Sequence, residues 1–256
     1  TAFGEKAEPL KKVIVSLNDI IQWALNFLIN KIAPVAIFCM ITRAFAVYGV
    51  EYISPTLVWI ATTIIVSLVL VVTIYPIGIF LTTRLNPFVF LKKSVKIGLF
   101  AAATNSSAAT LPINTKTCIE ELGCSKEISS FVLPTGMTIN MNGTTAMHMI
   151  AITFIGAASG MPVTPSTLVL TAFLSICTAV GTPAIPVAGT TMVYVVMMGI
   201  GFNTELCMIA YSLILAMNYL PGMAVITLNV IGDAATNVIV NHKEGSLNKD
   251  IYYSKK

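Results

Sequence analysis

The sequence contains few charged residues, fewer than a soluble protein needs on its surface. Only 10% of its 256 residues are Asp, Glu, Lys or Arg, whereas 56% are hydrophobic and the mean hydropathy is +0.85. A soluble domain carries about 25% charged residues, so this composition is typical of an integral membrane protein. Apolar stretches of about 20 residues recur, the length that a transmembrane helix needs. The sequence therefore predicts an all-α, polytopic membrane protein.

Cysteine is scarce, and basic residues are dispersed. The cysteines lie in or beside apolar segments without metal-ligand spacing, which favours buried thiols over disulfides or zinc. The net charge of +4 comes from basic residues near segment ends, so we expect topology signals and no nucleic-acid partner. Because the sequence begins at Thr1 rather than Met, we expect it to be the C-terminal part of a longer chain. The cysteines are Cys39, Cys118, Cys124, Cys177 and Cys207.

The first half of the chain predicts two spans and a hairpin. Residues 13–47 are apolar and should bend at Pro34, and residues 57–83 are free of charge. Residues 97–113 are apolar apart from a polar tip at 104–107. Each limb of that segment is too short to cross a bilayer. We therefore expect a re-entrant hairpin, which enters and leaves the membrane on one side.

The second half repeats this arrangement. A span over 128–158 is interrupted at 140–144, a second hairpin over 167–200 turns at 181–189, and a last interrupted span covers 206–240. Two opposed hairpins, each with a broken span, predict an inverted repeat with the solute at its interface near the midplane. An ion channel also uses re-entrant loops, so the architecture leaves the mechanism open.

Loop charges favour this topology. The lead-in at 1–12, the connections at 84–96 and 114–127 and the polar tail hold most basic residues. With both hairpins re-entrant, these segments share one side, which the positive-inside rule makes cytoplasmic. We expect the C-terminal tail to be cytoplasmic and mobile. The connections without lysine or arginine are 48–56, 156–166 and 201–205.

The pentad Asn140-Met141-Asn142-Gly143-Thr144 is the strongest candidate for a binding site. Asparagine and glycine are poor helix formers, and backbone polar groups freed by a helix break are costly in hydrocarbon. Such a break is tolerated where it lines a protein-enclosed cavity. The alternative is a kinked helix whose polar side chains bond neighbouring helices.

Asp233 is the only acidic residue deep in the last span. A carboxylate at that depth is expensive unless paired, which makes it a candidate cation ligand. The alternative is a carboxylate that is protonated or hydrogen-bonded to Asn229. His148 fits a hydrogen-bonded structural histidine better than a proton carrier. An intramembrane hydrolase is disfavoured because Asp233 has no second acid and Ser106 and Ser107 have no evident base.

Four motifs, in order, resemble those of the dicarboxylate/amino acid:cation symporters, the glutamate-transporter homologues. The resemblance covers nearly the whole chain, and its second motif departs from the family's N-M-D-G-T at one position, Asn142. The motifs are Ser106-Ser107-Ala108-Ala109-Thr110-Leu111-Pro112, the pentad at 140–144, Gly181-Thr182-Pro183-Ala184-Ile185-Pro186 with Gly189, and Asn229-Val230-Ile231-Gly232-Asp233.

The resemblance implies an elevator-type transporter that assembles as a homotrimer in a plasma or inner membrane. Residues 1–56 would be a scaffold-type helix with its lead-in, 57–240 the transport domain and 241–256 the cytoplasmic tail. Residues 13–256 would match the last four spans and both hairpins of the family. The first four of the usual eight spans would then be absent here.

The resemblance also implies coupling cations, Na⁺ or alternatively H⁺, and no organic cofactor. The third cation site of the family uses the aspartate that Asn142 replaces, so we expect fewer coupled cations. One implied site comprises Asp233 with carbonyls of Gly136, Asn140 and Asn229. The other comprises carbonyls of Thr138, Ala179, Val180 and Thr182.

The implied solute pocket combines the first hairpin tip, the broken span and the second tip. The family's side-chain-binding arginine, its neighbouring threonine and its amine-binding aspartate fall on Val225, Ile226 and Gly222. An apolar wall leaves a second carboxylate unpaired, which favours a neutral amino acid or small organic acid over a dicarboxylate or acidic amino acid. The other implied pocket residues are Ser106, Ser107, Thr144, Val180, Gly181, Thr182, Pro186, Gly189 and Asn229.

Together these expectations describe a secondary symporter and not an enzyme. It would couple Na⁺ or H⁺ to uptake of a small carboxylate-bearing solute across a lipid bilayer. The alternative is a channel-like or transport-incompetent relative that keeps the fold, because the arginine and two aspartates are lost.

Overall fold

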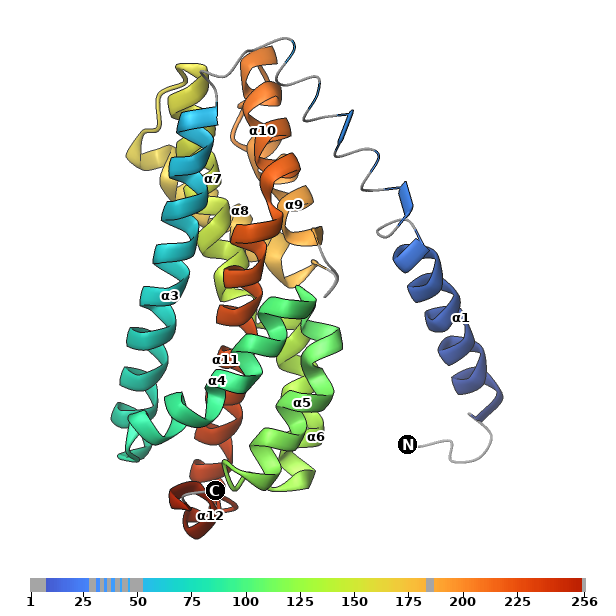
Figure 1. Ribbon diagram of the computed structural model, residues 1–256, viewed down its shortest axis with the longest axis vertical. Helices are drawn as coiled ribbons and strands as arrows, with labels where there is room; N and C mark the ends of the chain where they lie inside the picture. Colours follow the sequence, from blue (N-terminus) through green and yellow to red (C-terminus); the bar gives the residue numbers. More distant parts are fainter. Residues whose placement is uncertain are drawn as a thin grey trace. The chain divides into compact units, whose positions relative to one another are not determined.

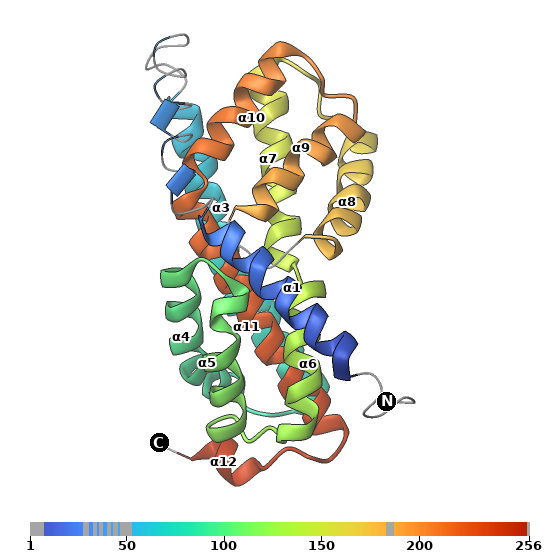
Figure 2. The same cartoon turned by 90° about the vertical axis from the view of Figure 1, so that its right-hand side faces the viewer.

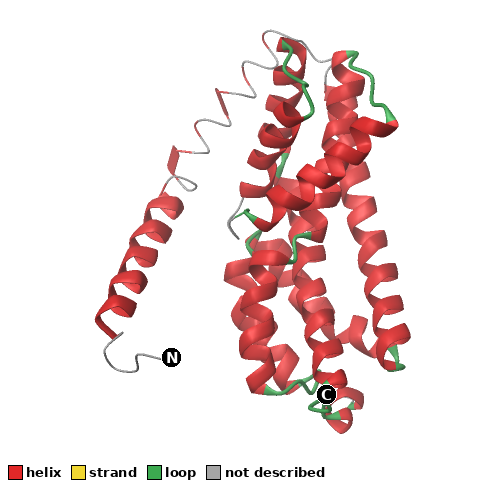
Figure 3. Cartoon of the chain, turned by 180° about the vertical axis from the view of Figure 1, so that it is seen from behind, coloured by secondary structure: helices red, strands yellow, loops and turns green. Residues whose placement is uncertain are grey.

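The computed structural model describes residues 8–27, 53–182 and 187–254, together with isolated positions between 31 and 46. The chain forms two compact units, Thr1–Gly49 and Val50–Lys256. Figure 3 shows helices joined by loops, and the described residues contain no strand. The all-α expectation is confirmed for this part of the chain.

In the first unit the structure describes α1 (Glu8–Phe27). The helix begins inside the lead-in predicted at 1–12, and Glu8 in its first turn suits the positive end of the helix dipole. The rings of Trp23 and Phe27 stack with centroids 5.9 Å apart. Most of the remaining predicted segment up to residue 47, including the expected bend at Pro34, lies outside the described residues.

The second unit begins with α3 (Ile53–Thr83), the predicted charge-free span. Among the described residues, Pro55–Thr83 and Tyr219–Lys243 are the two helices long and apolar enough to cross a membrane by themselves. The first is mostly exposed and the second mostly buried. Tyr219–Lys243 (α11) therefore lies at the centre of the unit, and α3 packs along it (Figure 1).

The first hairpin consists of α4 (Pro87–Thr104) and α5 (Ser107–Glu120). Asn86 caps α4, Ser106 caps α5, and Asn105 between them adopts a left-handed conformation with φ 47°. Both limbs extend beyond the apolar segment 97–113, because the polar turns at their outer ends are helical too. A hairpin is thus present, and its re-entrant placement in a bilayer stays a prediction.

The expected breaks and the second hairpin are also present. The broken span is α6 (Lys126–Ile139) and α7 (Asn142–Ser159), so only two residues of the pentad lie outside a helix. The second hairpin is α8 (Pro165–Val180) and α9 (Ala188–Gly199), and the last span is α10 (Glu205–Met217) and α11, divided at Asn218. Figure 2 shows the two hairpins entering the unit from opposite ends, with their tips at mid-height.

A row of buried polar side chains on α11 joins it to α6 and α7. Asn229, Asp233, Asn237 and Asn241 are spaced by four residues, so they share one face of the helix. Nδ2 of Asn237 donates to Oγ of Ser129 at 2.9 Å. Asn241 accepts a bond from the backbone N–H of residue 125 at 2.7 Å and donates to Oδ1 of Asn237 at 3.1 Å. Asn237 and Asn241 therefore form a hydrogen-bonded seam between α11 and the start of α6.

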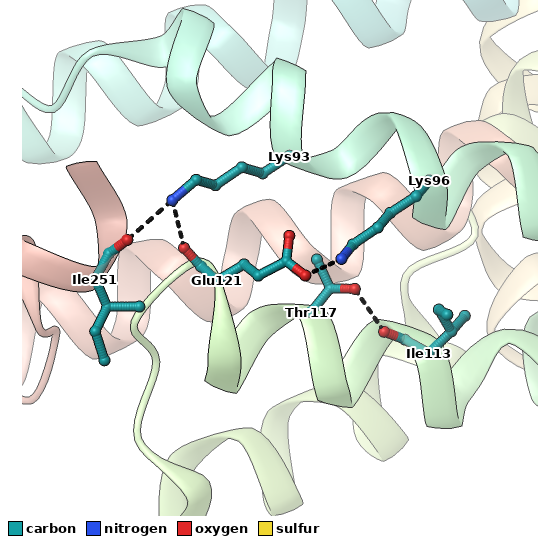
Figure 4. Close-up of polar contacts among 6 residues, drawn as sticks. All are labelled: Lys93, Lys96, Ile113, Thr117, Glu121 and Ile251. Carbon is teal, nitrogen blue, oxygen red and sulfur yellow. Dashed lines mark hydrogen bonds and ion pairs between the residues drawn. The ribbon is translucent and has the colours of Figure 1, made fainter. Parts of the chain in front are cut away.

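The expected mobile tail is wrong for residues 244–254. Helix α12 (Lys249–Tyr253) packs beneath the first hairpin, and Tyr252 is fully buried. Nζ of Lys93 donates to the carbonyl oxygens of Glu121 at 2.7 Å and Ile251 at 2.9 Å (Figure 4). It also donates to the carbonyl oxygen of Tyr252 at 2.7 Å. Polar composition suggested mobility, but one buried tyrosine and one buried ammonium group attach the segment to the fold.

Candidate functional site

A small cavity lies where the two hairpin tips meet the broken helices. Its volume is about 30 Å³, room for about two water molecules, so a solute requires movement of a lining element. Its lining side chains carry no ionisable group. The lining residues are Asn105, Met141, Thr144, Met147, Thr182, Val187, Gly189, Thr190, Asn218, Gly222, Val225 and Ile226.

Half of the expected solute-binding residues line this cavity. These are Thr144, Thr182, Gly189, Gly222, Val225 and Ile226. Ser106 and Ser107 are buried at the first tip next to the lining Asn105, and Asn229 contacts Thr144 from behind. Val180 and Gly181 are exposed and do not line it, and Pro186 lies outside the described residues.

Asn229 organises the wall formed by the helix break. Its Oδ1 accepts the backbone N–H of Gly143 at 2.7 Å, and its Nδ2 donates to Oγ1 of Thr144 at 3.2 Å. A Cβ at Gly143 would lie 2.6 Å from the carbonyl oxygen of Val225, so only glycine permits this approach. The start of α7 is thereby held against α11, and Thr144 is fixed at the cavity.

Asp233 lies in the polar cluster next to the break. It is 3% exposed, and its Oδ1 accepts a bond from Nδ2 of Asn140 at 2.8 Å. The same amide group donates to the carbonyl oxygen of Asn229 at 3.2 Å. A Cβ at Gly136 would lie 2.7 Å from Oδ1 of Asp233, so glycine keeps space beside the carboxylate. Carboxylate, amide and carbonyl oxygens are donors that suit a hard cation.

The residues of the other implied cation site do not surround one cavity. Thr138 is exposed, and its hydroxyl group donates within its own helix to the carbonyl oxygen of Thr135 at 2.9 Å. Ala179 and Val180 line a second cavity of about 430 Å³ beside α3, whereas Thr182 lines the small one. Because this site was expected to use backbone carbonyls, it stays a prediction.

Asn142, at the position of the family aspartate, also lines the second cavity. Its Nδ2 donates to the hydroxyl oxygen of Tyr75 at 3.4 Å, and that hydroxyl group donates to the carbonyl oxygen of Leu228 at 2.9 Å. The side chain is thus a neutral amide in a hydrogen-bonded chain, without a formal charge to attract a cation.

His148 connects the broken span to the second hairpin. The ring is fully buried, and its Nε2 lies 2.8 Å from the carbonyl oxygen of Gly189. Because a carbonyl oxygen only accepts, Nε2 is the donor. This geometry is the hydrogen-bonded structural role favoured from the sequence. The bond ties α7 to the start of α9 at the second hairpin tip.

Sequence reasoning missed several lining residues. Asn105 lay in the quoted polar tip, and Asn218 stood out as a polar residue in the last apolar segment, so both carried a signal. Met141 lay within the pentad at 140–144 and Val187 within the turn at 181–189, whereas Met147 and Thr190 carried no signal, since methionine and threonine are ordinary in apolar helices. The missed residues are Asn105, Met141, Met147, Val187, Thr190 and Asn218.

Comparison with known proteins decides the family. The model of the sodium:dicarboxylate symporter family matches residues 1–243. The chain belongs to the sodium:dicarboxylate symporter family. Membership confirms the resemblance inferred from the four motifs. It also confirms the all-α membrane fold class, and the family's members are symporters rather than enzymes.

Several relatives of the chain are excitatory amino acid transporters. The chain is 31% identical to mouse excitatory amino acid transporter 2 over 241 residues, which is 93% of the chain and 41% of that protein. It is 31% identical to human excitatory amino acid transporter 1 over 240 residues, 93% of the chain and 43% of that protein. A Caenorhabditis elegans excitatory amino acid transporter is 30% identical over 236 residues, 91% of the chain and 44% of that protein. The chain therefore spans about two fifths of the length of these relatives.

Proposed function

We propose that this chain is the solute- and cation-binding part of a secondary symporter that couples Na⁺ to uptake of a small carboxylate-bearing solute. The observation that carries the proposal is the cavity enclosed by two opposed hairpin tips and the helix break beside Asp233. Irregular backbone at the meeting of an inverted repeat is the usual location of solute and ion sites in transporters. The family description favours Na⁺ over H⁺ as the coupling ion.

The solute class follows from the lining of the cavity. Val225 and Ile226 form an apolar wall, so a second carboxylate would lack a cationic partner. A neutral amino acid or small organic acid fits better. The relatives' names speak of excitatory amino acids, and an acidic amino acid remains the alternative substrate.

The first hairpin tip is the proposed position of the solute carboxylate. Oγ of Ser106 accepts the backbone N–H of Ala109 at 3.2 Å, which orders the first turn of α5. Oγ of Ser107 is buried and has no hydrogen-bond partner among the described residues. The N-terminus of a helix attracts an anion, and here it adds to a free hydroxyl group.

The wider assembly belongs to the same proposal. Residues 57–240 would form the moving transport domain, residues 1–56 a trimeric scaffold element, and residues 241–256 a cytoplasmic segment. The basic residues of the lead-in, the connections and the tail support a cytoplasmic location for residues 241–256. In this proposal the second hairpin tip, between α8 and α9, has a gating role, and it borders the small cavity through Thr182 and Gly189.

The decisive experiment is uptake into proteoliposomes by the complete protein. Radiolabelled small carboxylic and amino acids are tested with and without an inward Na⁺ gradient. Saturable uptake above the external concentration, dependent on the gradient, supports a symporter. Equilibration without accumulation would instead support the channel-like alternative, because a channel cannot concentrate its solute.

A further inference from the structure

An unsatisfied amide group stands at the junction of α10 and α11. Asn218 lines the cavity and is 4% exposed. Asparagine often caps the start of a helix with its side chain, but that of Asn218 makes no cap bond to α11. Its Oδ1 has no hydrogen-bond partner among the described residues. A buried acceptor without a partner is costly, and one that lines a cavity is placed to accept a hydrogen bond from a donor in that cavity.

A second amide group lies on the same part of the cavity. Asn105, at the left-handed turn of the first hairpin, is 3% exposed, and its Nδ2 donates to the carbonyl oxygen of Tyr219 at 3.4 Å. Gly222 separates the two amides. A Cβ at Gly222 would lie 3.1 Å from Nδ2 of Asn105 and 3.4 Å from Nδ2 of Asn218. Glycine therefore lets both asparagines approach α11 at this point.

This amide pair is electrically neutral. The cavity lining contains no carboxylate, and Asp233 is not among the lining residues. An ammonium group moved here would lose its water and find only neutral acceptors, whereas a hydroxyl group needs a single acceptor. Asn105 directly precedes Ser106 and Ser107, so one amide of the pair belongs to the hairpin tip that carries the proposed carboxylate position.

We propose that Oδ1 of Asn218 accepts a hydrogen bond from a hydroxyl group on the carbon next to the solute carboxylate. Asn105 and Gly222 shape this subsite. It selects a small 2-hydroxy monocarboxylate over the amino acid of the same size and shape. The inference rests on the proposed symport function and narrows its substrate class.

The test compares lactate with alanine, which differ in this one group. The purified complete protein is titrated with each by calorimetry in the presence of Na⁺. We expect lactate to bind at least about tenfold more tightly, the effect of one modest interaction. In Asn218→Asp, a carboxylate faces the solute. The affinity for alanine should therefore rise, and the affinity for lactate should fall, by at least about tenfold each. Asn203→Asp, in an exposed loop, adds the same charge and should leave the ratio unchanged.

The wild-type ratio decides the proposal even if Asn218→Asp fails to fold. Alanine binding as well as lactate or better would overturn it, as would an unchanged ratio in a folded Asn218→Asp. Na⁺-dependent binding of other carboxylates with no preference for the hydroxyl group would overturn this subsite and leave the symporter standing. If no carboxylic or amino acid binds or is taken up, the proposed function fails first.

Discussion

Among single residues, Asp233 has the clearest expected effect. Asp233→Asn keeps the size and the hydrogen bonding of the side chain but removes the charge that would attract a cation into a buried site. We expect Na⁺-dependent uptake to fall by at least about a hundredfold, since truncating a buried charged interaction costs several kilocalories per mole. Proteoliposome uptake at varied Na⁺ measures this. Unchanged Na⁺ dependence in a folded variant would remove Asp233 from the cation site.

His148 is the second test at this scale. His148→Gln places an amide N–H near the position of Nε2 and should keep the bond to Gly189, whereas the shorter Asn should lose it. We therefore expect Asn, but not Gln, to raise the KM for the solute by about five- to tenfold with little change in kcat, because one hydrogen bond contributes about 1 kcal/mol. Equal KM values for the two variants would show that the bond does not hold the tip.

The sequence predicted the polar residues of the site better than it predicted which residues pack around them. Thr144 and Asp233 were expected because polar residues are expensive in an apolar helix, and Asn229 because the family resemblance implies it. The structure gathers all three around one helix break. Asn218 was not assigned a role, because a polar residue at a helix junction is also a common cap. Its importance depends on a missing partner, which only coordinates reveal.

Among elements, α12 and the first hairpin offer a test of stability. Lys93→Met keeps most of the side-chain volume but removes the ammonium donor from three carbonyl oxygens, of which that of Ile251 keeps its bonds from Ser254. Those oxygens lie at the C-terminal ends of α5 and α12, where a cation is favourable. We expect a loss of about 1–3 kcal/mol of stability, measured as a lower melting temperature in detergent. Lys92→Met, at an exposed neighbour, should have little effect. Equal losses would mean that the ammonium group does not hold the tail.

The predicted boundaries of the elements were correct only where a helix ends at the same residue as the apolar segment. The breaks and hairpin tips were located closely because Gly, Asn and Ser interrupt the apolar pattern there. The outer turns of α4 and α5 were missed, since residues 87–96 and 114–120 are polar on one side yet helical. The tail was misjudged for the same reason. Its attachment depends on Tyr252 fitting between distant elements, which no local pattern encodes.

For the whole molecule, the predicted topology can be tested by labelling. Single cysteines are introduced at Asn203 and Ser246 in a background without the native cysteines. A membrane-impermeant thiol reagent should label Asn203→Cys from outside the cell and Ser246→Cys only after the membrane is opened. The reason is that re-entrant hairpins put all basic connections on one side. Labelling of both from the same side would mean that a hairpin crosses the membrane completely.

The seam of amides along α11 also limits how the unit can deform. A shift of α11 along α6 by part of a turn would separate Asn237 from Ser129 and Asn241 from the backbone N–H of residue 125, leaving buried polar groups without their partners. Gradual sliding between these helices is therefore penalised at every intermediate step. We therefore expect α6 and α11 to move as one rigid piece in the proposed transport cycle, with the bending confined to the loops that join this piece to the rest of the chain.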